Sequence, residues 1–265
     1  MLLAIDIGNT TVKLGGLRDG KVLFSVHLDT VRGAGADFYR PSMEKVFSHA
    51  RRQPVRFEGV VITSVVPELT DVLAGCAAEW SRTPPLIVSP GVDTGLQFAV
   101  PHPERLGKDR LVDAAAAAAE YPLPVVTVDL GTATTFNVVD EQHRFLGGVI
   151  CAGLSTQLRA LNEKCAQLPP VRLGPPQGAI GTDTQSCMRN GAVLGAAALI
   201  DGITDRIEAQ LGRPVTLVVT GGLSRFVAPY CRRSLICDPQ LMLKGLALIY
   251  RRNAAAPAEE KHKKA

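Results

Sequence analysis

One pattern of hydrophobic and polar positions occurs twice in the chain. Residues 5–11, Ile-Asp-Ile-Gly-Asn-Thr-Thr, and residues 128–134, Val-Asp-Leu-Gly-Thr-Ala-Thr, each lead from an apolar run through an Asp and a Gly to small polar side chains. A second apolar run follows each, at 12–17 and at 135–139. Such a pattern is typical of a β-hairpin with a polar tip. Since corresponding positions of the two copies are 123 residues apart, it also predicts a duplicated domain.

The remaining pattern predicts an α/β chain with two similar halves. After a turn at Asp19-Gly20, we expect helices at 36–52, 111–120, 154–168, 186–211 and 240–252, and strands at 59–66, 84–88 and 215–220. The segment Tyr121-Pro122-Leu123-Pro124 ends the alanine-rich helix. We therefore place the domain junction there, with one domain at 1–121, a second at 122–253 and a flexible tail at 254–265.

The two polar tips have the composition of phosphate-binding loops. A Gly lets a ligand approach the backbone, successive amides and hydroxyls can hold phosphate oxygens, and an Asp can hold a metal ion or its waters. An ordinary turn is the alternative for either copy taken alone. The chain has no G-x-x-x-x-G-K-[ST] loop and no G-x-G-x-x-G segment after a strand, so P-loop and Rossmann folds lack support.

A third segment, Thr220-Gly221-Gly222, ends another apolar strand and either suits close approach of a nucleotide or forms a tight turn. Together, the two hairpins and this segment resemble the ATPase superfamily of actin, sugar kinases and Hsp70-type chaperones. The resemblance implies two related α/β domains of the actin-like, ribonuclease H-like type that face each other across a nucleotide cleft. The length of 265 residues allows two domains of about 120 residues, each with its own core.

Composition and charge narrow the class of protein. Hydrophobic residues make up 46% and charged residues 20% of the chain, which is typical of a soluble globular protein. Asp6 breaks the first apolar run and no run is long enough to span a bilayer, so we expect a cytoplasmic protein without a membrane contact. The net charge of +4 is dispersed and does not indicate nucleic acid binding. The six cysteines and five histidines have no metal-binding spacing, so neither zinc nor a disulfide framework is expected.

The segment that discriminates best between functions is 106–111, Leu-Gly-Lys-Asp-Arg-Leu, where a loop enters the alanine-rich helix. Asp109 could accept a proton from an alcohol, and Arg110 could bind an acidic substrate through two hydrogen bonds. The alternative is a helix-start Asp that complements the helix dipole beside a solvated Arg.

In order and spacing, the motifs of the chain resemble those of type III pantothenate kinases. The matching segments are Asp6-Ile7-Gly8-Asn9-Thr10, Thr63-Ser64-Val65-Val66-Pro67, Gly107-Lys108-Asp109-Arg110, Asp129-Leu130-Gly131-Thr132, Ile180-Gly181-Thr182-Asp183-Thr184 and Thr220-Gly221-Gly222-Leu223. The similarity extends over nearly the whole chain up to Asn253. It implies ATP-dependent phosphorylation of pantothenate on its primary hydroxyl, the first step of coenzyme A synthesis, by a homodimer that requires Mg²⁺ and a monovalent cation, K⁺ or NH₄⁺.

The resemblance also implies roles for single residues. Asp109 falls at the position of the family's general base, Asp129 at that of its monovalent-cation ligand, and Thr184 at a substrate contact. ATP would be bound by Asp6, Ile7, Gly8, Asn9, Thr10, Thr11, Val12, Lys13 and Thr132, and pantothenate by Gly107, Lys108, Asp109, Arg110 and Thr184. Lys13 could instead be an outward-facing strand lysine. Val100 stands where many relatives have a Tyr that contacts the substrate, and Ala152 where a Pro is common.

Two other functions fit part of the pattern. A nucleotide-binding regulator of transcription fits because some proteins of this family were first described as accessory transcription factors, although no helix-turn-helix pattern accompanies it. A sugar kinase of the same superfamily would keep the ATP-binding tips but need a polar sugar-binding loop in place of residues 107–110. The apolar, small-residue helix at 191–200 should be covered all round, either by the core of the second domain or by a dimer partner.

Overall fold

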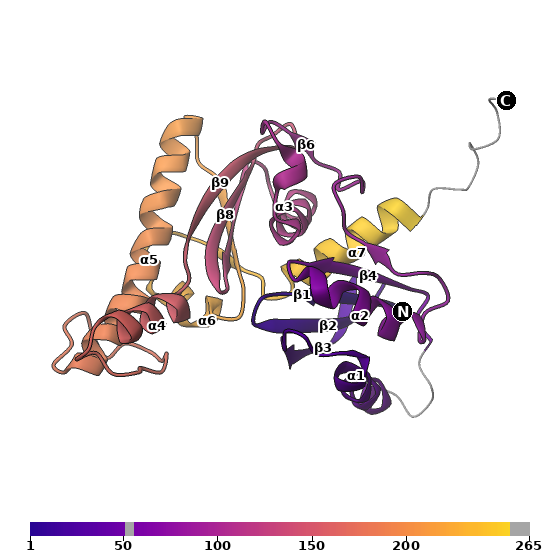
Figure 1. Ribbon diagram of the computed structural model, residues 1–265. Coiled ribbons are helices and arrows are strands. Elements are labelled where there is room, and N and C mark those ends of the chain that lie inside the picture. The colour runs from indigo at the N-terminus through magenta and orange to yellow at the C-terminus, as the bar shows by residue number, and fades with distance from the viewer. Residues whose placement is uncertain (51–55, 255–265) are drawn as a thin grey trace. The chain divides into compact units, whose positions relative to one another are not determined.

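The computed structural model of the chain describes residues 1–50 and 56–254 and shows an α/β protein with two mixed sheets (Figure 1). Two compact units are formed from interleaved segments. The first contains Met1–Leu96, His102–Ala116 and the last helix from Met242 onward, and the second contains Gln97–Pro101 and Ala117–Leu241. In the described part of the chain, no helix is long and apolar enough to cross a membrane. The tail predicted at 254–265 lies outside the described residues except for Ala254, which is helical.

The first unit is built on a five-stranded sheet with the order β3-β2-β1-β4-β5. Its strands are β1 (Leu2–Ile7), β2 (Thr11–Arg18), β3 (Lys21–Asp29), β4 (Gly59–Ser64) and β5 (Leu86–Ile87). The β1, β2 and β3 meander is antiparallel, whereas β4 pairs parallel to β1 and β5 parallel to β4. Asp19 and Gly20 have φ values of 51° and 77° between β2 and β3, which confirms the tight turn predicted there.

Helices pack on both faces of this sheet because successive residues of a strand point to opposite faces. Ile5 belongs to a core that α1 and α2 help to form, and Ala4 belongs to a core on the other face that includes α3 and α7. Asp6 continues the series of Ala4, so its side chain lies on the face of α3 and α7. The helices of this unit are α1 (Ala36–Ala50), α2 (Pro67–Ala78), α3 (Lys108–Glu120), whose last turn belongs to the second unit, and α7 (Leu241–Ala254).

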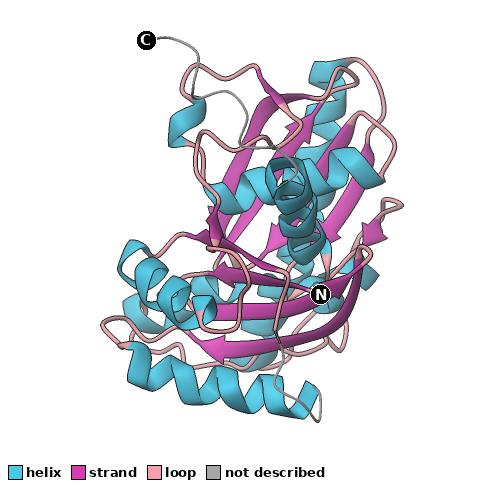
Figure 2. Cartoon of the chain, turned by 90° about the vertical axis from the view of Figure 1, so that its right-hand side faces the viewer, coloured by secondary structure: helices cyan, strands magenta, loops and turns pink. Residues whose placement is uncertain are grey.

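The second unit is built on a six-stranded sheet with the order β11-β10-β7-β8-β9-β6. Its strands are β6 (Gln97–Phe98), β7 (Val125–Leu130), β8 (Ala133–Val139), β9 (Arg144–Ala152), β10 (Thr216–Thr220) and β11 (Ile236–Cys237). Its helices are α4 (Leu154–Lys164), α5 (Thr184–Leu211) and the short α6 (Ser224–Val227). Val128 of β7 and Val219 of β10 form a core with Val193 and Ile200 of α5. In Figure 2 the strands of the chain are magenta and the helices that cover them are cyan.

The five strands of the first sheet have counterparts in the same order in the second sheet, which also contains β6 at its edge, and this supports the duplication predicted from the sequence. Strands β1 to β5 correspond in turn to β7, β8, β9, β10 and β11. The offset of 123 residues holds through the first strand, since Leu2–Ile7 corresponds to Val125–Leu130. In both units the three strands of the meander are antiparallel and the fourth strand runs parallel to the first.

Beyond the tip the offset changes by one residue. Val12 lies opposite Ile7, whereas Thr134 lies opposite Leu130, so the offset there is 134 minus 12, or 122. The register shift between Gly16 and Leu17 and the one between Val138 and Val139 are also 122 residues apart. The equivalence predicted between Thr11 and Thr134 is therefore wrong by one residue, because the second tip is one residue shorter.

Most predicted elements are present with shifted ends. The alanine-rich helix begins at Lys108, the helix expected to reach 168 ends at Lys164, and the strand expected at 59–66 ends at Ser64. Helix α2 was not predicted, although Pro67 occupies its first turn, where a proline is tolerated. The domain boundary proposed at 121/122 stays a prediction. The compact units of the structure divide the chain differently, because the second unit resumes at Ala117 and the last helix belongs to the first unit.

Candidate active site

The first tip is a three-residue turn held in place by the end of β3. The Gly8 amide donates to the Thr11 carbonyl at 3.0 Å and closes the turn. Thr30, which follows β3, donates its hydroxyl to the Gly8 carbonyl at 2.7 Å and its amide to the Thr10 carbonyl at 3.1 Å. Asn9 and Thr10 are exposed at the tip, and the guanidinium of Arg32 donates to Asn9 Oδ1 at 3.0 Å. The sequence did not indicate Thr30 or Arg32.

Asp6 lies at the end of β1 with polar residues on both neighbouring strands. Its register partners are Lys13 on β2 and Thr63 on β4. Register partners share a face of the sheet, so the three side chains lie on the face of α3 and α7. Asp6 and Lys13 are half-buried, and Thr63 is fully buried.

Gly107 directly precedes α3 and residues 108–110 form its first turn, so the segment lies where a loop enters the helix, as predicted, and it belongs to the same unit as the first tip. Asp109 Oδ1 accepts a hydrogen bond from the Arg110 amide at 2.9 Å. A Cβ atom on Gly107 would lie 2.6 Å from the same oxygen, so the carboxylate occupies space that only a glycine leaves open. Burial lowers the pKa of the Arg110 guanidinium, and the charge of Asp109 opposes that shift. A partly desolvated guanidinium beside a carboxylate suits an acidic substrate with a hydroxyl to be deprotonated.

The second tip contacts the start of α4. Gly131 donates its amide to the Ala133 carbonyl at 3.1 Å. The Thr132 carbonyl accepts from the Gly153 amide at 3.1 Å and from the Thr156 hydroxyl at 2.7 Å. Thr132 itself is exposed, which leaves its side chain accessible to a ligand. Thr156, like Thr30 in the first unit, is a supporting residue that the sequence did not indicate.

Asp129 lies beside the Thr-Gly-Gly segment, as the parallel pairing of β7 with β10 requires. Thr220 is its register partner, and Gly221 follows with a φ of +91°. A Cβ atom on Gly221 would lie 2.3 Å from Asp129 Oδ1, 2.6 Å from the Leu130 amide nitrogen and 2.7 Å from the Leu130 carbonyl oxygen. Gly221 therefore packs directly against the end of β7, and the Asp129 carboxylate beside it is an oxygen ligand of the kind that hard cations prefer. Across the described residues, no group of three or more His, Cys, Asp or Glu side chains is arranged around a metal site.

Thr184 is the first residue of α5, in the second unit, and is exposed. Asp183 caps this helix by accepting from the Ser186 amide and from the Ser186 hydroxyl, each at 2.9 Å, and these two hydrogen bonds lower the pKa of Asp183. Val100, in the position of the relatives' Tyr, follows β6, and its Cγ1 lies 3.8 Å from where a Cβ on Gly147 would be. The side chain at this position is apolar and brings no hydroxyl.

The sequence model of the family described as type III pantothenate kinase matches residues 2–206, more than half of the chain. The chain belongs to this family. It is 37% identical over 256 residues to the type III pantothenate kinase of Myxococcus xanthus, with 97% of this chain and 100% of that protein covered. It is also 37% identical over 261 residues to the enzyme of Listeria monocytogenes, with 98% and 100% covered. The predicted family and its pantothenate kinase activity are confirmed by these matches.

Solved structures show that the fold is shared more widely. A protein from Campylobacter jejuni described as a Baf family transcriptional activator superposes with a TM-score of 0.62 at 19% identity, and the match covers 96% of this chain and 100% of that one. Component A of (R)-2-hydroxyglutaryl-CoA dehydratase from Acidaminococcus fermentans gives 0.56 at 15% identity, with 94% and 96% covered. At these identities the likeness concerns the fold, and it confirms the predicted actin-like α/β class.

Proposed function

We propose that the chain transfers the γ-phosphate of ATP to the primary hydroxyl of pantothenate and forms 4'-phosphopantothenate and ADP, the first step of coenzyme A biosynthesis. The family match supports the overall reaction. The observation that carries the assignment of residues is the placement of the Gly107–Arg110 segment at a helix start, in the same unit as the first polar tip.

In the proposed mechanism, Asp109 is the general base. Its carboxylate accepts the proton of the pantothenate hydroxyl as that oxygen attacks the γ-phosphorus, and the bond from the γ-phosphorus to the bridging oxygen breaks to release ADP. Arg110 pairs with the pantothenate carboxylate and fixes the hydroxyl in line for attack, which is most of what phosphoryl transfer asks of a protein. Lys108 and Thr184 are the remaining proposed contacts to the substrate, beside Gly107, which leaves room for the base.

ATP is bound in this proposal by the segment Asp6 to Lys13, with Thr132 from the second tip. Amides and hydroxyls of the tips hold phosphate oxygens, and the ammonium of Lys13 offsets their charge. Asp129 would hold the monovalent cation, K⁺ or NH₄⁺, next to Gly221 of the Thr-Gly-Gly segment. Mg²⁺ bound to the ATP phosphates would supply neutralisation of the charge that develops on them. A homodimer and a cytoplasmic location complete the proposal and rest on the family resemblance.

The test is release of ADP with pantothenate compared with a panel of sugars, in K⁺ and in its absence. We expect turnover with pantothenate alone, and Asp109→Asn should lower it by about two to four orders of magnitude, the usual contribution of a general base. ATP binding by the variant should be unchanged, which separates lost chemistry from lost folding. Turnover with a sugar, or near-wild-type activity of Asp109→Asn, would contradict the assignment.

A further inference from the structure

A row of polar residues runs across four strands of the first sheet. Lys13 of β2 pairs with Asp6 of β1 on one side and with His27 of β3 on the other, and Asp6 pairs with Thr63 of β4. Because register partners share a face, His27, Lys13, Asp6 and Thr63 all lie on the face of α3 and α7. Lys13 and Asp6 belong to the segment proposed to bind ATP, whereas nothing so far assigns a role to His27 or Thr63.

The second unit carries the same row without its cations. Asp129 of β7 pairs with Thr135 of β8 and Thr220 of β10, and Thr135 pairs with Ile150 of β9. Ile150, in the place of His27, is 61% exposed, and Thr135, in the place of Lys13, is neutral. The Asp and the Thr are thus common to both rows, while the two basic residues are specific to the first.

The two residues at the ends of the first row, His27 and Thr63, have polar groups that can bind a ligand. The Thr63 hydroxyl is buried, and within the described residues no hydrogen-bond partner lies in reach of it. His27 is accessible, although enough of its ring is covered to lower its pKa, and the nearby charge of Lys13 lowers the pKa further. Besides Lys13, the charged group on the same face near His27 is Asp29, two residues along β3 and opposite Thr11. Helix α1 contacts β3, but its buried side chains belong to the core on the opposite face of the sheet from His27.

We propose that His27 is a further ligand of the ATP phosphate chain, which it binds beside Lys13 as the protonated imidazolium. The inference rests on the proposed ATP-binding role of the first tip. A polyanion near Lys13 offsets the repulsion between the two cations and attracts a second positive charge. Binding of ATP therefore takes up a fraction of a proton from solvent on His27, and the linkage makes binding tighter as the pH falls through the pKa of the bound state.

The first experiment measures the Kd of ATP with Mg²⁺ at pH 6.0 and 8.5 for the wild type, His27→Gln and the control Ser25→Gln, which lies on the same exposed side of the same strand. We expect His27→Gln to weaken binding about 3- to 10-fold at pH 6.0 and less than about 2-fold at pH 8.5, since a unit of pKa shift is worth a factor of ten. Ser25→Gln should bind as the wild type does. Protonation of ATP itself is common to all three proteins and cancels in the ratios.

The second experiment follows the imidazole resonance of His27 by NMR as the pH is varied, with and without inorganic tripolyphosphate, and assigns it by its absence in His27→Gln. A rise of about half to one unit in the pKa of His27 on adding the polyanion supports the inference. An unchanged pKa, or a ratio of Kd values that is the same at both pH values, would overturn it while ATP binding persists. Failure of the wild type to bind ATP at all would instead overturn the proposed function from which it starts.

Discussion

Gly221 lies against Asp129, at the end of the strand that leads into the second tip, in a place where a side chain does not fit. Its φ of +91° is unfavourable for other residues, and a Cβ would press on Asp129 Oδ1. Gly222, the next residue, has open space where its Cβ would be. The two neighbouring glycines therefore offer a matched pair of variants.

We expect Gly221→Ala to abolish stimulation by K⁺ and Gly222→Ala to retain it, because only the first substitution displaces the Asp129 carboxylate that is proposed to hold the cation. The measurement is ADP release as a function of K⁺ at saturating ATP and pantothenate. A Gly221→Ala enzyme with the wild-type K⁺ dependence would contradict the location of the cation, as would a normal response of Asp129→Ala.

Thr30 illustrates a residue that supports the first tip from outside it. Thr30→Val keeps the amide hydrogen bond to Thr10 but removes the hydroxyl donor to the Gly8 carbonyl. A lost hydrogen bond of this kind costs about 0.5–1.5 kcal/mol, so we expect the Kd of ATP to rise about 2- to 10-fold. Thr83→Val is the control. The Thr83 hydroxyl donates to the Glu58 carbonyl, and Glu58 precedes Gly59, which pairs with Leu2 at the end of β1 opposite to the tip. Equal effects of both variants on ATP binding would argue against a role at the tip.

At the level of residues, local patterns sufficed for the tips and for the start of α3. The polar run after an apolar strand, and an Asp-Arg pair where a loop enters a helix, are visible in the order of residues alone. Thr30 and Thr156 were missed because each reaches a tip through the pairing or packing of a later element. Such contacts depend on register, which a single sequence does not specify.

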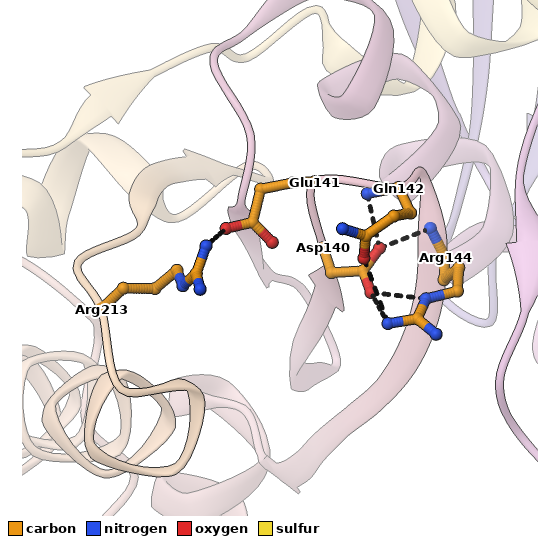
Figure 3. A network of polar contacts seen from close by, with 5 residues as sticks. All are labelled: Asp140, Glu141, Gln142, Arg144 and Arg213. Carbon is orange, nitrogen blue, oxygen red and sulfur yellow. Dashed lines mark hydrogen bonds and ion pairs between the residues drawn. The ribbon is translucent and has the colours of Figure 1, made fainter.

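At the level of elements, the turn between β8 and β9 is held by one carboxylate (Figure 3). Asp140 accepts from the Gln142 amide at 3.0 Å, from the Arg144 amide at 2.9 Å and from Arg144 Nε at 2.7 Å. Burial alone would raise the pKa of Asp140, but the hydrogen bonds from Arg144 and Gln142 outweigh it and the pKa is lowered. Glu141 points the other way and pairs with Arg213.

A lowered pKa means that the ionised Asp140 stabilises the folded state above its unfolded value of 3.8, and that this contribution is lost as the pH falls through the lower folded value. We expect Asp140→Asn to lower the free energy of unfolding by about 1–3 kcal/mol at pH 7, since Asn has one neutral acceptor oxygen for three donors and its NH₂ group cannot accept from Arg144 or Gln142. The difference from the wild type should shrink at pH 3. Urea unfolding at both pH values measures it, with Glu141→Gln, at an exposed pair, as a control worth under about 1 kcal/mol. A difference that does not change with pH would show that the charge plays no part.

The elements that the sequence predicted well are those with a long periodic signal. Both meanders and α5 span enough residues for alternation or helical spacing to be read, and the capping box at Asp183 begins α5 two residues earlier than predicted. Strands β6 and β11 have two residues each and exist only by pairing with β9 and β10. Helix α2 was missed because apolar residues precede Pro67 without a polar capping residue.

At the level of the whole molecule, α5 is only partly covered by its own chain. Val193 and Ile200 are buried in the core of the second unit, whereas Gly191, Gly195 and Ala198 are exposed. Of the two expected forms of cover, complete burial in the core of the second domain is therefore wrong, because one face of the helix is exposed, and cover by a dimer partner stays a prediction. The homodimer stays a prediction.

If Thr184 of one protomer completes the site of Asp109 in the other, two inactive variants should complement each other. Mixing equal amounts of Asp109→Asn and Thr184→Ala with subunit exchange should restore about a quarter of the wild-type activity, since half of the dimers are mixed and each has one intact site. A mixture of Asp109→Asn with Asp109→Ala is the control and should stay inactive. A fully active monomer in sedimentation, or no recovery despite proven exchange, would contradict a shared site.

The shorter second tip indicates that the two halves of the chain changed in length after the duplication. Doubling of one gene segment explains the common strand order, and a later gain or loss of a single codon at an exposed tip, where changes of length are tolerated, explains the change of offset. Aligning the halves without a gap sets Lys13 against the buried Phe136 and exchanges the inside and outside of the whole strand. One gap at the tip sets Lys13 against Thr135 instead. Comparisons of the two halves across the family therefore need that gap before any residue of one half can be matched to its counterpart.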